Sequence, residues 1–169
     1  MQQNNTTPEQ PNGHATSEAT ATEFNIQRIY TKDISYESPN TPQLFREPWQ
    51  PNVDVELNVN TANLGEDHYE VKLSITTTVK SQDKMAFLAE VHQAGIFKIQ
   101  GFSGAQLHRM LGSYCPNILF PYIREAISDL VVRGGFPPLY LTPINFDVLY
   151  DQQLQKQQEN KAAETTGDQ

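Results

Sequence analysis

The chain of 169 residues has one cysteine, Cys115, which is its only thiol nucleophile. His108 precedes it by seven residues, or about two helical turns, so its imidazole is a candidate base for the thiol. Such a pair, or Cys115 with His92, would fit a small hydrolase or transferase. The alternative is a small buried side chain before Pro116. No basic cluster surrounds Cys115 to lower the pKa of its thiol, so the buried side chain is preferred.

Other signatures of catalysis or cofactor binding are missing from the sequence. There is no GxxxxGK[ST] loop for nucleotide phosphates, and the glycines of Gly101–Gly104 suit a turn between a strand and a helix. The histidines lack metal-ligand spacing, and a single cysteine excludes both a thiolate zinc site and an intrachain disulfide. We therefore expect a protein that binds other molecules without a cofactor or metal, and not an enzyme.

The charge balance restricts the partners. Twelve Lys and Arg residues against 20 Asp and Glu residues give a net charge of −8. Nucleic acid is a poor partner for such a chain, because phosphate binding needs a basic surface. A basic protein partner is favoured instead.

Acidic residues gather on one expected strand face. Asp33 and Glu37 share the solvent parity of the first predicted strand and lie about 13 Å apart. Leu88 and Glu90 share the even parity of the fourth predicted strand. If both strands face the same solvent, these residues form an acidic surface with an apolar spot that suits a basic partner. The alternative is a sheet face that is merely solvated.

Aromatic residues are unusually frequent in segments that should be loops. Such residues either pack in the core or an interface, or bind something. They lie in a proline-rich segment, at an expected helix break and after the helix end: Phe45, Trp49, Phe120, Tyr122, Phe136 and Tyr140.

Four strands are predicted to hold these residues. Alternating polarity predicts a strand over 24–37, a hairpin of strands over 53–59 and 69–75, and a fourth strand over 85–99. The proline-rich stretch from 38 to 52 excludes a central strand or a helix and is expected to form a long crossover. One face of the first strand would carry its apolar residues Phe24, Ile26, Tyr30, Ile34 and Tyr36.

Helical spacing replaces alternation after residue 101. Apolar residues from 107 to 131 follow the helical period, with a break or kink expected near Pro116 and Pro121. Gly134 and Gly135 should end this helix, and Asn145 should cap a last one. Strands followed by helices predict an α+β domain: a four-stranded antiparallel sheet with helices packed on one face.

Both ends of the chain are polar. Residues 1–23 and 155–169 have too few large apolar side chains to offset the entropy of ordering, so we expect disordered tails around a domain spanning 24–154. No targeting segment and no apolar run long enough to span a membrane is visible. A cytoplasmic protein without direct membrane insertion is expected.

Four blocks of the sequence resemble the SecB family of bacterial protein-export chaperones. They are QRIYTKDIS (27–35), EPWQPN (47–52), SYCPNILFPYIRE (113–125) and RGGFPPLYLTPINFD (133–147). The resemblance runs from about Phe24 to Tyr150, which is nearly the whole expected domain.

The resemblance implies a function and an assembly. Such proteins form homotetramers, as dimers of dimers, and hold newly made secretory precursors unfolded without ATP. They deliver these precursors to the translocase motor ATPase SecA. The wide apolar stripe of the predicted helix over 118–131 fits an assembly, because one sheet cannot cover all of it.

The resemblance also implies roles for individual residues. The residues that dock SecA map onto Asp33, Glu37, Leu88 and Glu90, the acidic surface described above. The residues that affect tetramer assembly map onto Ala89, Val91 and Gln93, on the opposite face of the same strand. A groove for clients between the crossover and the last helix would be lined by Trp49, Tyr122 and Phe136. The alternatives left open are the enzyme that uses Cys115 and an adaptor protein without a client groove.

Overall fold

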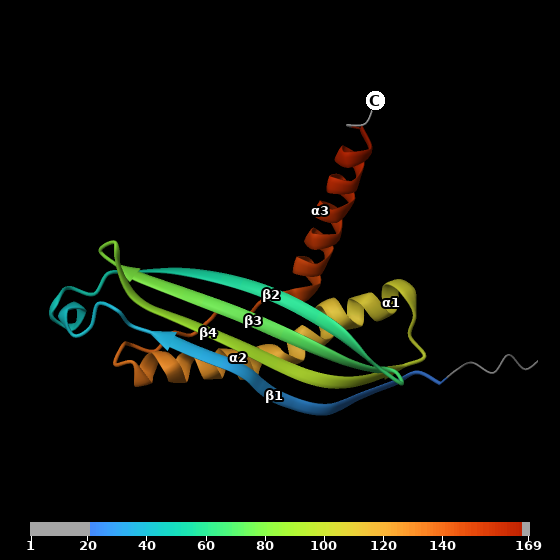
Figure 1. Cartoon of the computed structure of the whole chain (residues 1–169), viewed down its shortest axis with the longest axis horizontal. Coiled ribbons are helices and arrows are strands. Elements are labelled where there is room, and N and C mark those ends of the chain that lie inside the picture. The colour runs from blue at the N-terminus through green and yellow to red at the C-terminus, as the bar shows by residue number, and fades with distance from the viewer. Residues whose placement is uncertain (1–20, 167–169) are drawn as a thin grey trace, which may run out of the picture.

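The computed structural model describes residues 21–166 and has the predicted α+β architecture. One antiparallel sheet is formed by β1 (Glu23–Glu37), β2 (Pro51–Gly65), β3 (His68–Ser81) and β4 (Lys84–Gln100), in the order β1-β4-β3-β2. The helices are η1 (Gln43–Arg46), α1 (Gly104–Arg109), α2 (Cys115–Arg133) and α3 (Phe146–Thr166). In Figure 1, α2 runs along one face of the sheet while α3 rises away from it.

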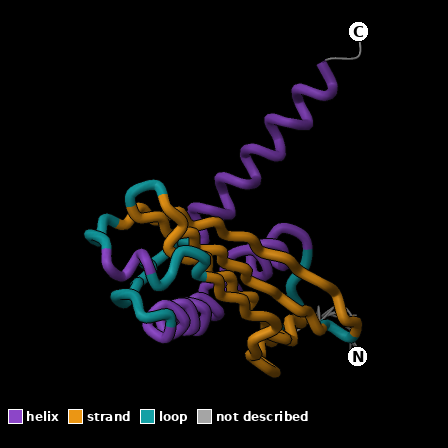
Figure 2. The backbone as a smooth tube through the Cα atoms, turned by 60° about the vertical axis from the view of Figure 1, so that its left-hand side comes forward, coloured by secondary structure: helices purple, strands orange, loops and turns teal. Residues whose placement is uncertain are grey.

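The core lies between the central strands and α2. Side chains of β3 and β4 alternate between buried odd positions and partly exposed even positions, as strand geometry requires. The odd positions face α2, whose buried side chains include Leu119, Ile123, Ile127 and Val131, each four residues after the one before. Figure 2 shows α1 and α2 on one side of the strands, and among residues 21–166 no helix covers the opposite face of the sheet, which we call the open face.

The structure corrects the face predicted for Tyr30. The β1–β4 pairing shifts register between Ile26 and Arg28 and again between Thr31 and Asp33. Each irregularity adds a residue, so parity inverts after the first and returns after the second. Tyr30 therefore lies on the open face, where its hydroxyl donates a hydrogen bond to Glu70.

The helical region is more continuous than predicted. Pro121 lies inside α2 without ending it. Its ring lacks the N–H that would donate to the carbonyl of Asn117, and the helix continues on both sides of it. The irregularity comes earlier, in the π-helical turn η2 (Met110–Tyr114), which joins α1 to α2. Gly135 follows the end of α2 at a φ of 84°, as the glycine pair predicts.

The C-terminal segment differs most from expectation. We predicted disorder over 155–169, but α3 continues through Thr166. Gln, Lys, Glu and Ala fill this segment and have high helix propensity, which composition-based reasoning about burial overlooks. The disorder predicted for the N-terminal tail concerns residues that lie almost entirely outside the described range. Within 21–166, no helix has the length and apolar character needed to cross a membrane.

Candidate functional site

The four predicted docking residues come together on the open face. Strand pairing sets Glu37 opposite Leu88 and Asp33 opposite His92. Glu90 lies between these two pairs, opposite Ser35. Asp33 and Glu37 are exposed, while Leu88 and Glu90 are half-buried. The second bulge in β1 returns Asp33 and Glu37 to the parity of the even positions in β4, so the predicted acidic surface forms.

Polar contacts fix part of this surface. Glu90 Oε1 lies 2.8 Å from His92 Nε2, and His92 Nδ1 lies 3.1 Å from Ser74 Oγ. His92 thereby holds the Glu90 carboxylate, whose side chain stays 38% exposed. Among the described side chains, Asp33 and Glu37 form no ion pair, so their charges are available to a partner.

A neighbouring part of the open face is neutralised internally. Lys32 Nζ lies 2.8 Å and 2.9 Å from the two carboxylate oxygens of Glu70, and the Tyr30 hydroxyl donates to the same carboxylate. These hydrogen bonds, from Lys32 first and Tyr30 second, lower the pKa of Glu70. The bond to Glu70 also raises the pKa of Tyr30 to about 12. Asp33 and Glu37, by contrast, have no lysine or arginine partner among the described side chains, and Glu90 contacts only His92.

An aromatic cluster forms on the helix-covered face, with Phe136 at its centre. The Phe136 ring centroid lies 5.0 Å from that of Phe45, 5.3 Å from that of Trp49 and 5.1 Å from that of Phe87. Tyr36 joins the cluster by stacking on Phe87 at 5.9 Å. Four segments meet here: β1, the crossover with η1, β4 and the stretch after α2.

The cluster belongs partly to the core and partly to the surface. Phe136 is only 6% exposed, whereas Trp49 is 37% exposed and Phe45 is 51% exposed. A small cavity of about 90 Å³ adjoins Trp49, with Phe87 and Pro137 in its wall. The Tyr36 hydroxyl lies so close to Gly134 that an added Cβ would overlap it. The exposed rings of Phe45 and Trp49 therefore stand on a tightly packed base.

Tyr122 does not join the aromatic cluster. It lies on the outer face of α2, is 48% exposed, and has no stacking partner among the described rings. Of the three residues predicted for a client groove, the structure thus brings together Trp49 and Phe136, with Phe136 as support rather than contact surface. Val132, 50% exposed, also lies on the outside of α2.

The three residues predicted for assembly are already buried within one chain. Ala89 and Val91 are 0% exposed and Gln93 is 4% exposed, on the side of β4 that faces α2. Thr31 Oγ1 lies 3.1 Å from Gln93 Oε1 and donates to it. The prediction that these residues lie opposite the docking residues on the same strand is confirmed. They offer no surface to another subunit, so an influence on assembly has to pass through α2 or β1.

Comparison with known proteins gives the chain its family. The sequence model described as preprotein translocase subunit SecB matches residues 17–157. The chain belongs to the SecB family. The protein-export protein SecB of Legionella pneumophila, in strains Corby, Lens and Paris, is 55% identical over 141 residues. That alignment covers 83% of this chain and 87% of each relative.

A solved structure agrees with this SecB fold. The SecB-like chaperone Rv1957 of Mycobacterium tuberculosis, in complex with a ChAD peptide from the HigA1 antitoxin, superposes with a TM-score of 0.60. The match covers 72% of this chain and 90% of that chain at 19% sequence identity. It supports the arrangement of the sheet and helices.

Membership of SecB, a family of protein-export chaperones, rejects the enzyme that uses Cys115. Cys115 is 0% exposed, and burial raises the pKa of its thiol to about 12. His108 is exposed on α1, and no hydrogen bond joins it to the thiol. Cys115 is therefore a packing residue of this SecB chain.

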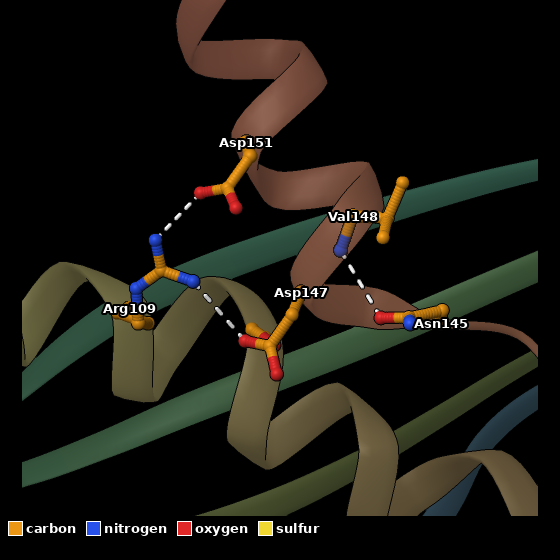
Figure 3. A network of polar contacts seen from close by, with 6 residues as sticks. Arg109, Asn145, Asp147, Val148 and Asp151 are labelled. Carbon is orange, nitrogen blue, oxygen red and sulfur yellow. Dashed lines mark hydrogen bonds and ion pairs between the residues drawn. The ribbon is translucent and has the colours of Figure 1, made fainter.

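One polar network of this SecB chain was missed by sequence reasoning. Arg109 Nη1 lies 3.2 Å from Asp147 Oδ1, and Arg109 Nη2 lies 2.5 Å from Asp151 Oδ1 (Figure 3). Ser113 Oγ donates to Asp147 Oδ1 at 2.7 Å. Asn145 caps α3 as predicted, because its Oδ1 accepts from the backbone N–H of Val148 at 3.1 Å. The i,i+4 spacing of the two aspartates was visible in the sequence, but their partner lies about forty residues away.

Proposed function

We propose that this SecB protein holds secretory precursor polypeptides unfolded without ATP and delivers them to the translocase ATPase SecA. The observation that carries this proposal is that the two sides of β4 contribute to two different surfaces. Phe87 belongs to the aromatic cluster on the helix-covered face, whereas Leu88 and Glu90 belong to the acidic surface of the open face. Two surfaces on opposite sides of one strand allow a client and the motor to be bound at the same time.

The aromatic cluster suits unfolded clients. An unfolded precursor exposes apolar side chains that a folded protein buries, and aromatic rings contact such side chains with little dependence on sequence. Each Å² of apolar surface covered contributes about 25 cal/mol. Phe45 and Trp49 provide the exposed rings, supported from below by Phe136. Because clients are selected by the apolar side chains they expose, this selection needs no ATP.

The acidic surface suits SecA as a basic partner. Asp33 and Glu37 carry exposed charges, and Leu88 adds an apolar contact opposite Glu37 and next to Glu90. The net charge of −8 acts in the same direction at longer range. Charges on such a surface mainly raise the rate at which the partner associates, and this effect weakens as the salt concentration rises.

We further propose a homotetramer, a dimer of dimers, that works in the cytoplasm. Exposed apolar side chains support an assembly, since Tyr122 and Val132 lie on the outer face of α2, and Ile26 and Ile34 lie on β1. β1 is also an edge strand with free backbone groups. Binding one long client to several subunits would strengthen holding without a new type of contact.

An aggregation assay with the full chain tests the holding activity. A chemically unfolded secretory precursor is diluted into buffer without ATP, and light scattering follows its aggregation with and without the chaperone. The proposal predicts suppression of aggregation, and no binding of the same precursor after it has folded. Light scattering of the chaperone alone should give a tetramer. Unhindered aggregation would contradict the holding function, and a monomer at micromolar concentration would contradict the assembly.

A further inference from the structure

His92 links the acidic surface to the neighbouring strand of the sheet. Its Nε2 atom lies 2.8 Å from Glu90 Oε1, and its Nδ1 atom lies 3.1 Å from Ser74 Oγ on β3. The His92 side chain is 23% exposed and that of Glu90 is 38% exposed, so solvent reaches both. An imidazole that is bound through both nitrogens keeps one ring orientation, and the carboxylate of Glu90 is held through it.

These contacts define where the protons of His92 lie. An ionised carboxylate only accepts hydrogen bonds, so Nε2 carries the hydrogen that joins the ring to Glu90. When the ring is neutral, Nδ1 accepts from the hydroxyl of Ser74. When the ring is protonated, Nδ1–H donates to the same oxygen, because a hydroxyl can rotate to serve either state. His92 can therefore change its charge without moving Glu90.

His92 lies beside two of the three carboxylates of the acidic surface. Asp33 is directly opposite it on β1, and Glu90 comes two residues before it on β4. Histidine is the side chain that ordinarily changes its charge between pH 5 and 8. A proton on this ring places a positive charge against Glu90 and lowers the combined negative charge of Asp33, Glu37 and Glu90 from three to two. A basic partner is then attracted more weakly.

Two lysines near this histidine act on a different carboxylate. Lys72 is one open-face position away on β3, and Lys32 lies in the second irregularity of β1. Lys32 donates two hydrogen bonds to Glu70. This contact first, the Tyr30 hydroxyl second and the charge of Lys72 last lower the pKa of that carboxyl. Among the described residues, His92 is the imidazole that lies beside the acidic surface.

We propose that His92 is a positioning residue of the acidic surface and makes partner docking depend on pH. The neutral ring holds Glu90 where a basic partner can reach its second carboxylate oxygen, whereas the protonated ring pairs with Glu90 and competes with the partner. The proposal rests on the SecA docking proposed above and adds regulation of that same surface. Docking should weaken as the pH falls through the range in which histidine ordinarily titrates.

Variants of the full chain test the pH dependence, with SecA as the probe. His92→Gln keeps an N–H donor but cannot be protonated. His68→Gln is the matched control, because it removes an imidazole from the same sheet face at the other end of β3, where its Nδ1 contacts the backbone carbonyl of Glu66. Titration calorimetry at low salt compares the affinity at about pH 8 with that at about pH 6.

The titratable groups of SecA contribute equally to all of these measurements, so the difference between variants isolates His92. The loss of affinity on acidification should be about fivefold larger for the wild type and His68→Gln than for His92→Gln. A loss in His92→Gln as large as in the wild type overturns the pH dependence. So does a loss in His68→Gln as small as in His92→Gln.

The positioning role is tested at about pH 8, where histidine is ordinarily neutral. His92→Leu removes the donor to Glu90, so SecA docking should weaken about threefold, and His92→Gln should restore the wild-type affinity. Equal affinities of His92→Leu and His92→Gln would overturn this role. Circular dichroism checks that each variant is folded. If His92→Leu is not folded, the pH comparison of His92→Gln with His68→Gln decides the proposal.

The outcomes also separate this proposal from docking itself. If Glu90→Lys weakens SecA binding while His92→Gln has the pH profile of the wild type, docking stands and the role of His92 is wrong. If the wild type holds an unfolded precursor but binds SecA at neither pH, the proposed docking fails and the role of His92 fails with it.

Discussion

The open face and the aromatic cluster share β4 but are built in opposite ways. The open face is an array in which neighbouring strands align Asp33, Glu37, Leu88 and Glu90 by backbone pairing. The aromatic cluster is assembled by side chains from the crossover, β4 and the segment after α2, and its centre, Phe136, is nearly buried. Charged residues on the open face can be substituted with little effect on the fold. Residues of the aromatic cluster pack against one another, so their substitution should affect both client binding and stability.

The largest contrast should come from adjacent residues on the two faces of β4. Val91→Glu buries a charge at a position that is 0% exposed, so it should lower the free energy of unfolding by about 4 kcal/mol or more. Glu90→Gln, one residue away on the open face, should change it by less than about 0.5 kcal/mol. Urea unfolding followed by circular dichroism measures both. If Val91→Glu folds with wild-type stability and only dissociates the oligomer, Val91 acts at a subunit surface.

A smaller but clear contrast is expected among the aromatic residues. Phe136→Ala removes the ring on which Phe45, Trp49 and Phe87 pack, at a cost of about 3 kcal/mol. Tyr122→Ala truncates an exposed ring outside the cluster, so it should cost less than about 1 kcal/mol in the isolated fold. Thermal unfolding compares the two variants. Equal losses would contradict the distinction between the cluster and the outer face of α2.

Cys115 provides a test that involves neither surface. Burial raises the pKa of its thiol from 9.0 to about 12, so between these values the unfolded chain loses the proton while the folded chain keeps it. Stability from this group is complete below pH 9 and declines as the pH rises toward 12. Cys115→Ala should cost about 1 to 2 kcal/mol at pH 7 and should weaken this decline. Retained client holding is expected, and a loss of holding without unfolding would revive a chemical role for the thiol.

The smallest effect is expected from the tails. A chain spanning Glu23 to Leu154 keeps all four strands, α2 and the network around Arg109, so it should form the same oligomer as the full chain. The helical signal in circular dichroism should fall by the contribution of the deleted part of α3. Loss of the strand signal would show that the tails support the domain.

The sequence predicted most of the open face because strand alternation assigns side chains to faces. It failed at Tyr30, since the bulges that invert parity leave no sign in the residue pattern. The members of the aromatic cluster were recognisable as aromatic residues in loops, but which of them meet depends on packing between distant segments. For that reason the sequence could not show that Tyr122 lies outside this cluster. The network of Arg109, Asp147 and Asp151 could not be predicted either, because it also joins segments that are distant in the sequence.

The central claim is that β4 separates a motor-docking surface from a client-holding one. The most direct test measures the affinities of Glu90→Lys and Trp49→Ala for SecA and for an unfolded precursor, in parallel and at two salt concentrations. Glu90→Lys should weaken SecA docking by about 1 kcal/mol or more, most strongly at low salt, and leave precursor binding intact. Trp49→Ala should do the reverse. If Glu90→Lys binds SecA normally at low salt, or loses the precursor instead, the two surfaces are not separate.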